Sequence, residues 1–394
     1  MPMTRVREEL VERAARLFRE RFAPRAAAYD QEARFPVENY EDLHREGLLG
    51  LVVPEEYGGL GASWREYVRI LKEMGKYCGS TALTFNMHSS VVRILSAMAS
   101  SEQKDRYFAE VVERGRYFAT LGSEPATSFR GTFTFQTFAT PVAGGYRIDG
   151  HKHFCSLAGH ASYYFVWALL EGAADVEQGL INLMVAADNP GARIEPSWDT
   201  MAMRATRSDS IYFERCFVPA ADVIGRPGDV LRKRLTDTFV LGYAATYLGI
   251  AAAALEYAGD YARRQTFLPD PRPIAHHAVV QRRIGEMHAL VTAADLALER
   301  AAELRDDPTA NPRERSLWTN QAKYLAGEAA YQVTDKALLL VGGRGISRRQ
   351  PLERYVRDAR ASHVMPPHGD ACLELVGRIF LGLPIIDLFG REVE

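Results

Sequence analysis

The chain has 394 residues, a formal net charge of -2 and an isoelectric point near 6.6. Hydrophobic residues make up 47% of it and charged residues 25%, which is typical of a globular protein that needs no disulfide or metal to stabilise its core. The small net charge argues against a nucleic-acid-binding protein, because such proteins usually carry a basic face.

The four cysteines stand far from one another and from histidines at metal-ligand spacing, so we expect neither a metal site nor a disulfide framework. Isolated cysteines suit a reducing compartment, and we expect a cytoplasmic protein. The N-terminus shows no apolar secretory segment. The most apolar run, residues 239–255, is short for a membrane span, so we predict a buried helix and no membrane span.

The first of three segments, residues 1–115, has the pattern of a helical domain. Apolar residues recur at helical spacing near the N-terminus. Ser100 followed by Gln103 predicts a capping box at the start of another helix. The turn-rich stretch 54–61, Pro-Glu-Glu-Tyr-Gly-Gly-Leu-Gly, predicts a break between helices.

The second segment, residues 116–226, has the pattern of a β domain. Gly144-Gly145 precedes an alternating stretch, which predicts a hairpin turn followed by a strand. Short apolar runs predict further strands at 163–170, 181–185 and 210–218.

The third segment, residues 227–394, is predicted to be a helical bundle. Three long stretches near 235–265, 276–305 and 313–341 carry apolar residues at helical spacing, and a last helix is expected at 370–382. Helices, then a β block, then helices is not the alternating order of a Rossmann fold.

Several short motifs occur in an order that resembles the acyl-CoA dehydrogenase family over nearly the whole chain. They include Gly122-Ser-Glu-Pro125, Gly150-His-Lys-His-Phe-Cys-Ser156, Met203-Arg-Ala-Thr206, Arg264-Gln-Thr-Phe267, Gly342-Gly-Arg-Gly345 and Arg357-Asp-Ala359. Each motif alone is more typical of a turn, a helix cap, the core or the surface, and only the ordered set is specific. The resemblance implies an α+β fold with an N-terminal helical domain, a middle β-barrel or sandwich domain and a C-terminal four-helix bundle.

The same resemblance implies a bound FAD and residues that contact it. Ser123 and Ser156 would hydrogen-bond the isoalloxazine ring, and Phe154 would lie beside it. Arg264, or its neighbour Arg263, would reach the FAD of an adjacent subunit, so a homodimer or homotetramer is expected. The remaining residues that match cofactor positions are Phe267, Gln281, Gly342, Gly343 and Gly345.

The residue that most of this family uses as catalytic base is missing. Counting from Arg357-Asp-Ala359, Pro366 takes the place of the family's glutamate, and proline cannot accept a proton. Some relatives place the base at the position of Phe239, which is also not a base, and Val240 replaces a nearby arginine that relatives use around coenzyme A.

Three other side chains are candidates for the proton transfer. His368 and Asp370 follow the vacant position by two and four residues, and a histidine can act near neutral pH. His88, in Phe-Asn-Met-His-Ser-Ser, is the third. Each also has a structural alternative: Asp370 as a helix cap, His88 as a core residue.

These observations leave three functions open. The first is oxidation of an acyl thioester at the α,β C–C bond with a relocated base, which needs an electron acceptor. The second is a monooxygenase on the same fold that takes reduced flavin from a partner reductase and uses oxygen. The third is a flavoprotein without catalytic activity that acts as a scaffold.

Overall fold

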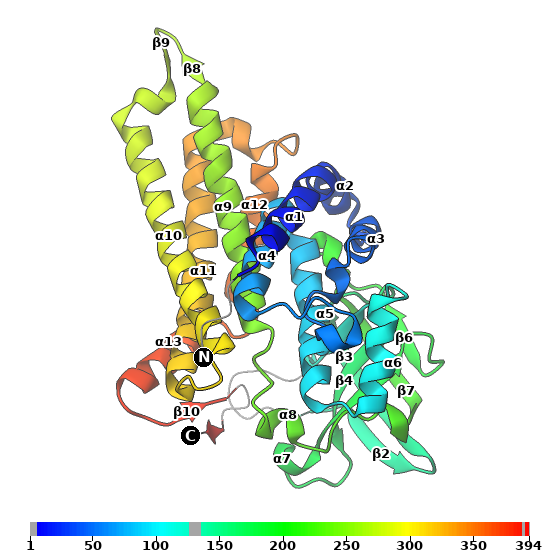
Figure 1. Ribbon diagram of the computed structural model, residues 1–394. Coiled ribbons are helices and arrows are strands. Elements are labelled where there is room, and N and C mark those ends of the chain that lie inside the picture. Colours follow the sequence, from blue (N-terminus) through cyan, green and yellow to red (C-terminus); the bar gives the residue numbers. More distant parts are fainter. Residues whose placement is uncertain (1–5, 126–134, 388–390, 394) are drawn as a thin grey trace.

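The computed structural model describes residues 6–125, 135–387 and 391–393. The chain forms a group of N-terminal helices, a β domain and a long helical bundle, which Figure 1 shows as three regions. The N-terminal helices are α1 (Glu8–Leu17), α2 (Ala23–Glu32), α3 (Val37–Arg45), α4 (Trp64–Tyr77), α5 (Gly79–Met98) and α6 (Ser101–Val112).

Helices α4 and α6 both begin at capping boxes. Ser63 and Ser100 accept a hydrogen bond from the backbone N–H three residues later, and the Glu66 and Gln103 side chains accept one from the backbone N–H of the cap residue. The capping box predicted at Ser100 and Gln103 is therefore confirmed.

The β domain is a single seven-stranded sheet with the order β1-β4-β2-β3-β7-β6, in which β5 pairs with β4. The hairpin predicted at Gly144-Gly145 is confirmed, because Val142 of β2 pairs with Gly145 of β3. The strands are β1 (Phe118–Leu121), β2 (Phe138–Val142), β3 (Gly145–Cys155), β4 (Tyr163–Leu170), β5 (Leu180–Ala186), β6 (Ala192–Glu195) and β7 (Asp209–Pro219), with the short helix α7 (Val176–Gly179) between β4 and β5.

The C-terminal region is built from α9 (Val240–Arg264), α10 (Ala278–Asp306), α11 (Pro312–Val341) and α12 (Leu352–Val364), followed by α13 (Gly369–Phe380). The sequence patterns did not predict α12 or the exposed hairpin of β8 (Thr266–Phe267) and β9 (Asp270–Pro273). The remaining elements are α8 (Asp229–Arg232), β10 (Ile385–Ile386) and β11 (Glu392–Val393).

Helix α9 is the core helix of the bundle and packs against α4, α5, α11 and α12. It is long and apolar enough to be a candidate membrane span, but 78% of its most apolar window is buried inside the fold. This burial is the behaviour expected of a core helix.

Two glycines allow α4 and α9 to cross closely. A Cβ on Gly75 would lie 2.5 Å from the Thr246 carbonyl oxygen, and one on Gly249 would lie 2.2 Å from the Lys72 carbonyl oxygen. Because both obstacles are backbone atoms, the helices would have to separate to accept any larger residue.

We predict that Gly249→Ala lowers the free energy of unfolding by about 1–3 kcal/mol, because it overpacks this crossing. Urea denaturation measures the change. Gly259→Ala on the same helix is the matched control, since the nearest atom to its new Cβ is the Arg263 guanidinium at 3.5 Å. The control should be neutral or stabilising by up to about 1 kcal/mol; equal losses in both variants would contradict the packing argument.

Candidate functional site

The first group of predicted cofactor residues gathers at one end of β3. Phe154 has a left-handed backbone with φ of +55°, at an irregularity in the pairing of β3 with β7. A bulky residue in this region of φ is strained, and such bulges often redirect a side chain next to a functional site. Phe154 consequently leaves 57% of its surface exposed, with Trp198 edge-on at 6.1 Å between ring centroids.

Ser156 lies two residues further, in a buried chain of hydroxyl groups. Its Oγ is 2.8 Å from the Oγ of Ser208, which is 2.7 Å from the Oγ1 of Thr206. Thr206 donates in turn to the Met203 carbonyl. An exposed aromatic face beside ordered hydroxyls is a suitable surface for a flat, polar-edged ring such as isoalloxazine.

Ser123 is held next to this surface by a buried ion pair. Lys152 Nζ lies 2.6 Å from Glu124 Oε1, and neither side chain is more than 1% exposed. The Glu124 carboxylate also accepts hydrogen bonds from the backbone N–H groups of Gln136 and Thr137. The Ser123 carbonyl oxygen itself accepts a hydrogen bond from the His153 N–H at 2.9 Å. Glu124 therefore fixes the Ser123 loop, as a structural rather than a reacting group.

The second group lies at the far tip of the bundle. Arg264 ends α9, Phe267 is half exposed in β8, and the Arg344 guanidinium is 5.6 Å from the centre of the Phe267 ring. Gln281 is exposed at the start of α10, where its amide donates to the Ala275 carbonyl. Figure 1 shows this hairpin at the end of the bundle opposite the β domain, so one chain does not bring the two groups together.

The three glycines of the second group have different roles. Added Cβ atoms at Gly342 and Gly343 would meet nothing within 4 Å, so the backbone there is open to a ligand. A Cβ at Gly345 would lie 2.8 Å from the Leu338 side chain, so this glycine is needed for packing. Gly342 and Gly343 are therefore open to a ligand, whereas Gly345 is buried against neighbouring side chains.

His88, one of the three candidate bases, is a core residue. It is fully buried on α5, with Nε2 3.1 Å from the Leu49 carbonyl oxygen and Nδ1 accepting from the Phe118 N–H at 3.2 Å. Burial lowers the pKa of His88 to about 4. Both ring nitrogens are engaged, so the geometry corrects the catalytic interpretation in favour of the structural one.

His368 and Asp370 are placed differently, because both line a cavity of about 920 Å³. His368 is the N-cap residue of α13, without a side-chain cap bond, and Asp370 lies exposed in the first turn. Pro367 joins them in the cavity wall. Val240 also lines the cavity, whereas Phe239 is the N-cap residue of α9 and its carbonyl accepts from Asn86 Nδ2.

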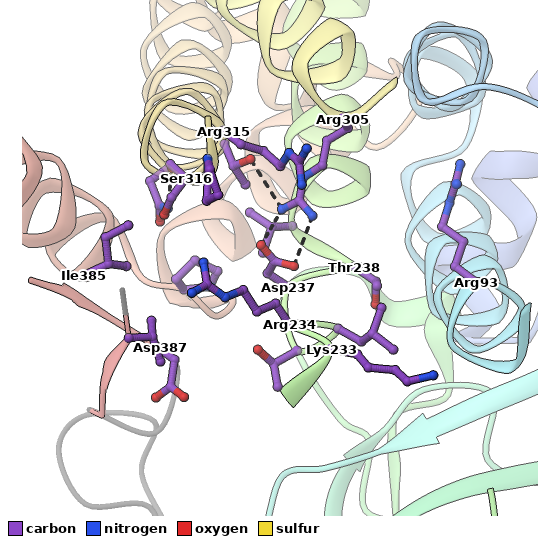
Figure 2. Close-up of a pocket in the computed structure, with 18 of the residues that line it drawn as sticks. Arg93, Lys233, Arg234, Asp237, Thr238, Arg305, Arg315, Ser316, Ile385 and Asp387 are labelled. Carbon is purple, nitrogen blue, oxygen red and sulfur yellow. Dashed lines mark hydrogen bonds and ion pairs between the residues drawn. The ribbon is translucent and has the colours of Figure 1, made fainter. Parts of the chain in front are cut away.

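The rest of the cavity is rich in charge, as Figure 2 shows. Arg305 binds the Asp237 carboxylate through both terminal nitrogens and lies near Thr319. Burial and the nearby Arg305 lower the pKa of Arg315, whose guanidinium donates to the Leu304 and Asp307 carbonyls. Sequence reasoning missed Arg93, Asp237, Thr238 and Arg305; Arg93 was detectable as the one formally charged residue within α5.

Helix α12 connects this cavity to the Phe154 surface. At its centre Asp358 accepts a hydrogen bond of 2.7 Å from the Met203 N–H, and Met203 also accepts from the Trp198 indole. Its C-terminal end leads into Pro367 and His368 of the cavity wall.

Sequence comparison decides the family. Three domain families cover the chain in order: "Acyl-CoA dehydrogenase, N-terminal domain" at residues 4–114, "middle domain" at 119–216 and "C-terminal domain" at 239–366. A Bacillus subtilis (strain 168) protein named as an acyl-CoA dehydrogenase, YdbM, is 31% identical over 358 residues, which span 89% of this chain and 91% of the relative. The chain is a member of the acyl-CoA dehydrogenase family.

This acyl-CoA dehydrogenase family member is a flavin-dependent oxidoreductase. It is also similar to a dibenzothiophene monooxygenase from Mycolicibacterium goodii, with 28% identity over 363 residues that span 86% of each chain. Among solved structures, TdsC from Paenibacillus sp. A11-2 in complex with FMN and indole matches with a TM-score of 0.88 and 25% identity, covering 97% of this chain and all of that one (100%).

We predict that Lys152→Met lowers the free energy of unfolding by about 3–5 kcal/mol and weakens flavin retention, because it leaves the Glu124 carboxylate buried and unpaired. Denaturant unfolding and the ratio of flavin to protein absorbance measure the two effects. The double variant Lys152→Met/Glu124→Leu should recover part of the stability; if the single variant keeps both properties, the pair does not hold the Ser123 loop.

The His88 geometry predicts a pH effect on stability. Its pKa in the folded protein, about 4, is below the ordinary value of 6.5, so the unfolded chain takes up a proton that the folded chain refuses. Stability should fall as the pH drops from about 6.5 towards 4, by up to about 1.4 kcal/mol per pH unit from this residue. The measurement is the free energy of unfolding as a function of pH in wild type and in His88→Gln. The slope between pH 4 and 6.5 should be smaller in the variant. Parallel slopes would contradict it.

Proposed function

We propose that the chain oxidises an acyl thioester at its α,β C–C bond, with FAD as the electron-accepting cofactor and a base that has moved away from the family position. The observation that carries the proposal is the cavity that His368 and Asp370 share with Pro367, directly after the vacant position at Pro366. The flavin surface at Phe154 and the family membership support it.

The residues present fit FAD. Phe154 offers an exposed aromatic face, Ser156 and the Ser123 loop offer hydrogen-bonding groups beside it, and Arg264 and Phe267 offer charge and stacking at the bundle tip. FAD supplies the two-electron acceptor when bound. Because the two groups lie at opposite ends of one chain (Figure 1), the proposal includes a homodimer or homotetramer in which the second group serves a neighbouring copy.

Asp370 is the carboxylate that we propose as the base. Asp370 follows Pro366 by four residues, and it lies exposed in the first turn of α13, on the wall of the cavity. In this proposal His368, at the N-cap, assists by hydrogen bonding to the substrate or to the base.

A monooxygenase is the second candidate, and one observation favours it. Neither position that dehydrogenases of this family use for the base holds a titratable side chain, since these positions are Pro366 and Phe239. The similarity to the monooxygenase extends over 86% of the chain. A monooxygenase would need a flavin reductase as its partner, to supply reduced flavin. A dehydrogenase would instead need an electron acceptor that reoxidises its flavin.

The two functions separate in one experiment. We expect the visible flavin band of the purified protein to bleach when acyl-CoA thioesters are added without oxygen. Asp370→Asn should slow bleaching by roughly 100-fold or more, as expected on removal of a general base. Glu374→Gln, one turn further along α13 and on the same cavity, is the matched control and should bleach normally.

Normal bleaching in Asp370→Asn would reject Asp370 as the base. A flavin that no thioester bleaches, together with oxygen consumption when reduced flavin is supplied, would replace the dehydrogenase by the monooxygenase.

A further inference from the structure

Arg93 is a half-buried arginine in which the Nε and Nη2 atoms form a buried edge without a described hydrogen-bond partner. It is the one formally charged residue in the 20 residues of α5, and it lines the cavity of about 920 Å³. Its Nε and Nη2 atoms are both buried and make no hydrogen bond to any described residue. Burial lowers the pKa of Arg93 to about 10. A buried charged donor without an acceptor is unfavourable, so the feature requires an explanation.

The unused atoms are a matched pair. Nε–H and Nη2–H lie parallel on one side of a guanidinium and together bind the two oxygens of a carboxylate. Other arginines of this chain use this edge in the same way: Arg7 binds Glu66 at 2.7 and 2.8 Å, Arg69 binds Glu299 at 2.7 and 3.0 Å, and Arg357 binds Glu353 at 2.7 and 2.9 Å. At Arg93 no carboxylate among the described residues binds this edge.

The groups around Arg93 hold it in place without filling this edge. Its guanidinium carbon lies 3.7 Å from the centre of the Trp64 ring and 4.9 Å from that of Tyr67. Stacking covers the faces of a guanidinium and leaves its in-plane donors available. Asp306, the nearby acid, accepts from the backbone N–H groups of Trp64 and Arg65 at 2.7 and 3.1 Å.

A second group without a partner lies in the same cavity. Thr238, which is 4% exposed, has a buried Oγ1 that bonds to no described residue. Figure 2 shows Thr238 on the side of the cavity that faces α5 and Arg93. Two neighbouring cations have partners: the terminal nitrogens of Arg305 bind Asp237, and Lys233 donates to the Ala97 carbonyl at 2.7 Å.

We propose that the Nε/Nη2 edge of Arg93, assisted by the Thr238 hydroxyl, binds a carboxylate at the distal end of the substrate's acyl group. The substrate class is then the mono-thioester of a dicarboxylic acid. This identification of the substrate rests on the proposed acyl-thioester function, whereas the carboxylate subsite itself does not. Both nitrogens are closed to water in the ligand-free conformation, so the carboxylate enters by displacing a neighbouring side chain.

Binding to the flavin-loaded protein tests the subsite without depending on turnover. Calorimetry under anaerobic conditions compares succinyl-, glutaryl- and adipyl-CoA with butyryl-, valeryl- and hexanoyl-CoA, which have the same chain lengths without the carboxylate. At least one dicarboxylic member should bind about 10- to 100-fold more tightly than its counterpart, as expected for a charge-assisted bidentate contact. The absence of such a preference at every chain length would overturn the proposal.

Substitutions at Arg93 and Thr238 test whether these two side chains cause the preference for dicarboxylic thioesters. Arg93→Met keeps an unbranched side chain next to Trp64 and should abolish the preference, and Thr238→Val should reduce it. Arg93→Lys keeps a charge but has no parallel edge, so it should also lose most of the preference, and it serves if Arg93→Met fails to fold. Arg300→Met, an arginine outside the cavity with its own carboxylate partners, is the control and should keep the preference.

Thermal unfolding separates a ligand-binding arginine from a structural one. Without ligand, Arg93→Met should unfold at the same temperature as wild type or higher, because it removes two buried donors without acceptors. A variant that loses stability and keeps the wild-type preference would show that Arg93 is structural. Bleaching of the flavin by the same thioesters is recorded separately: a preference without bleaching supports the subsite and contradicts the dehydrogenase.

Discussion

The contact on which the arrangement of the three regions depends is the buried charge cluster in the middle of α12. Arg357 binds Asp30 of α2 at 2.6 Å and the Met201 carbonyl at 2.9 Å, while Asp358 accepts from the Met203 N–H. Burial, and then the Asp30 carboxylate, raise the pKa of Asp358 to about 6. One turn of one helix thus joins the N-terminal helices, the loop that supports the flavin surface and the bundle. The same helix leads into Pro367 and His368 of the cavity wall, so the cluster also helps to position the cavity.

Two buried charged sites in the chain differ in whether their hydrogen bonds are completed, and this difference bears on function. Lys152 and Glu124 are paired, and additional backbone N–H groups complete the carboxylate's hydrogen bonds. Such a pair fixes a conformation, here that of the Ser123 loop, even where its net contribution to stability is small. Arg93 has no such compensation from the described residues. A matched pair of buried donors without a described acceptor, on a residue that lines a cavity, is a feature expected of a binding site.

The sequence was sufficient for the fold because the signals were local and repeated. Capping boxes, the Gly144-Gly145 turn and the helical periodicity of α9 to α11 each depend on a few neighbouring residues. The shorter α12 and the β8–β9 hairpin were missed, because the first follows a turn-rich stretch and the second contains prolines. The site was less predictable. Whether His88 is a base or a core residue depends on Leu49 and Phe118, which are distant in sequence, and pattern alone cannot place them around its ring.

The absence of the family glutamate and the presence of Arg93 can be understood together. The proposed base, Asp370, lies on the α13 wall of the cavity, whereas Arg93 and Thr238 lie on the walls formed by α5 and the start of α9. A ligand held at both walls has one end fixed by a charge-assisted contact and its other end near the base. Orientation by a distal group converts binding energy into correct placement of the reacting bond. An anchor of this kind would set where the reacting carbons of the substrate lie relative to Asp370, so the distal anchor and the displaced base belong to one proposed arrangement.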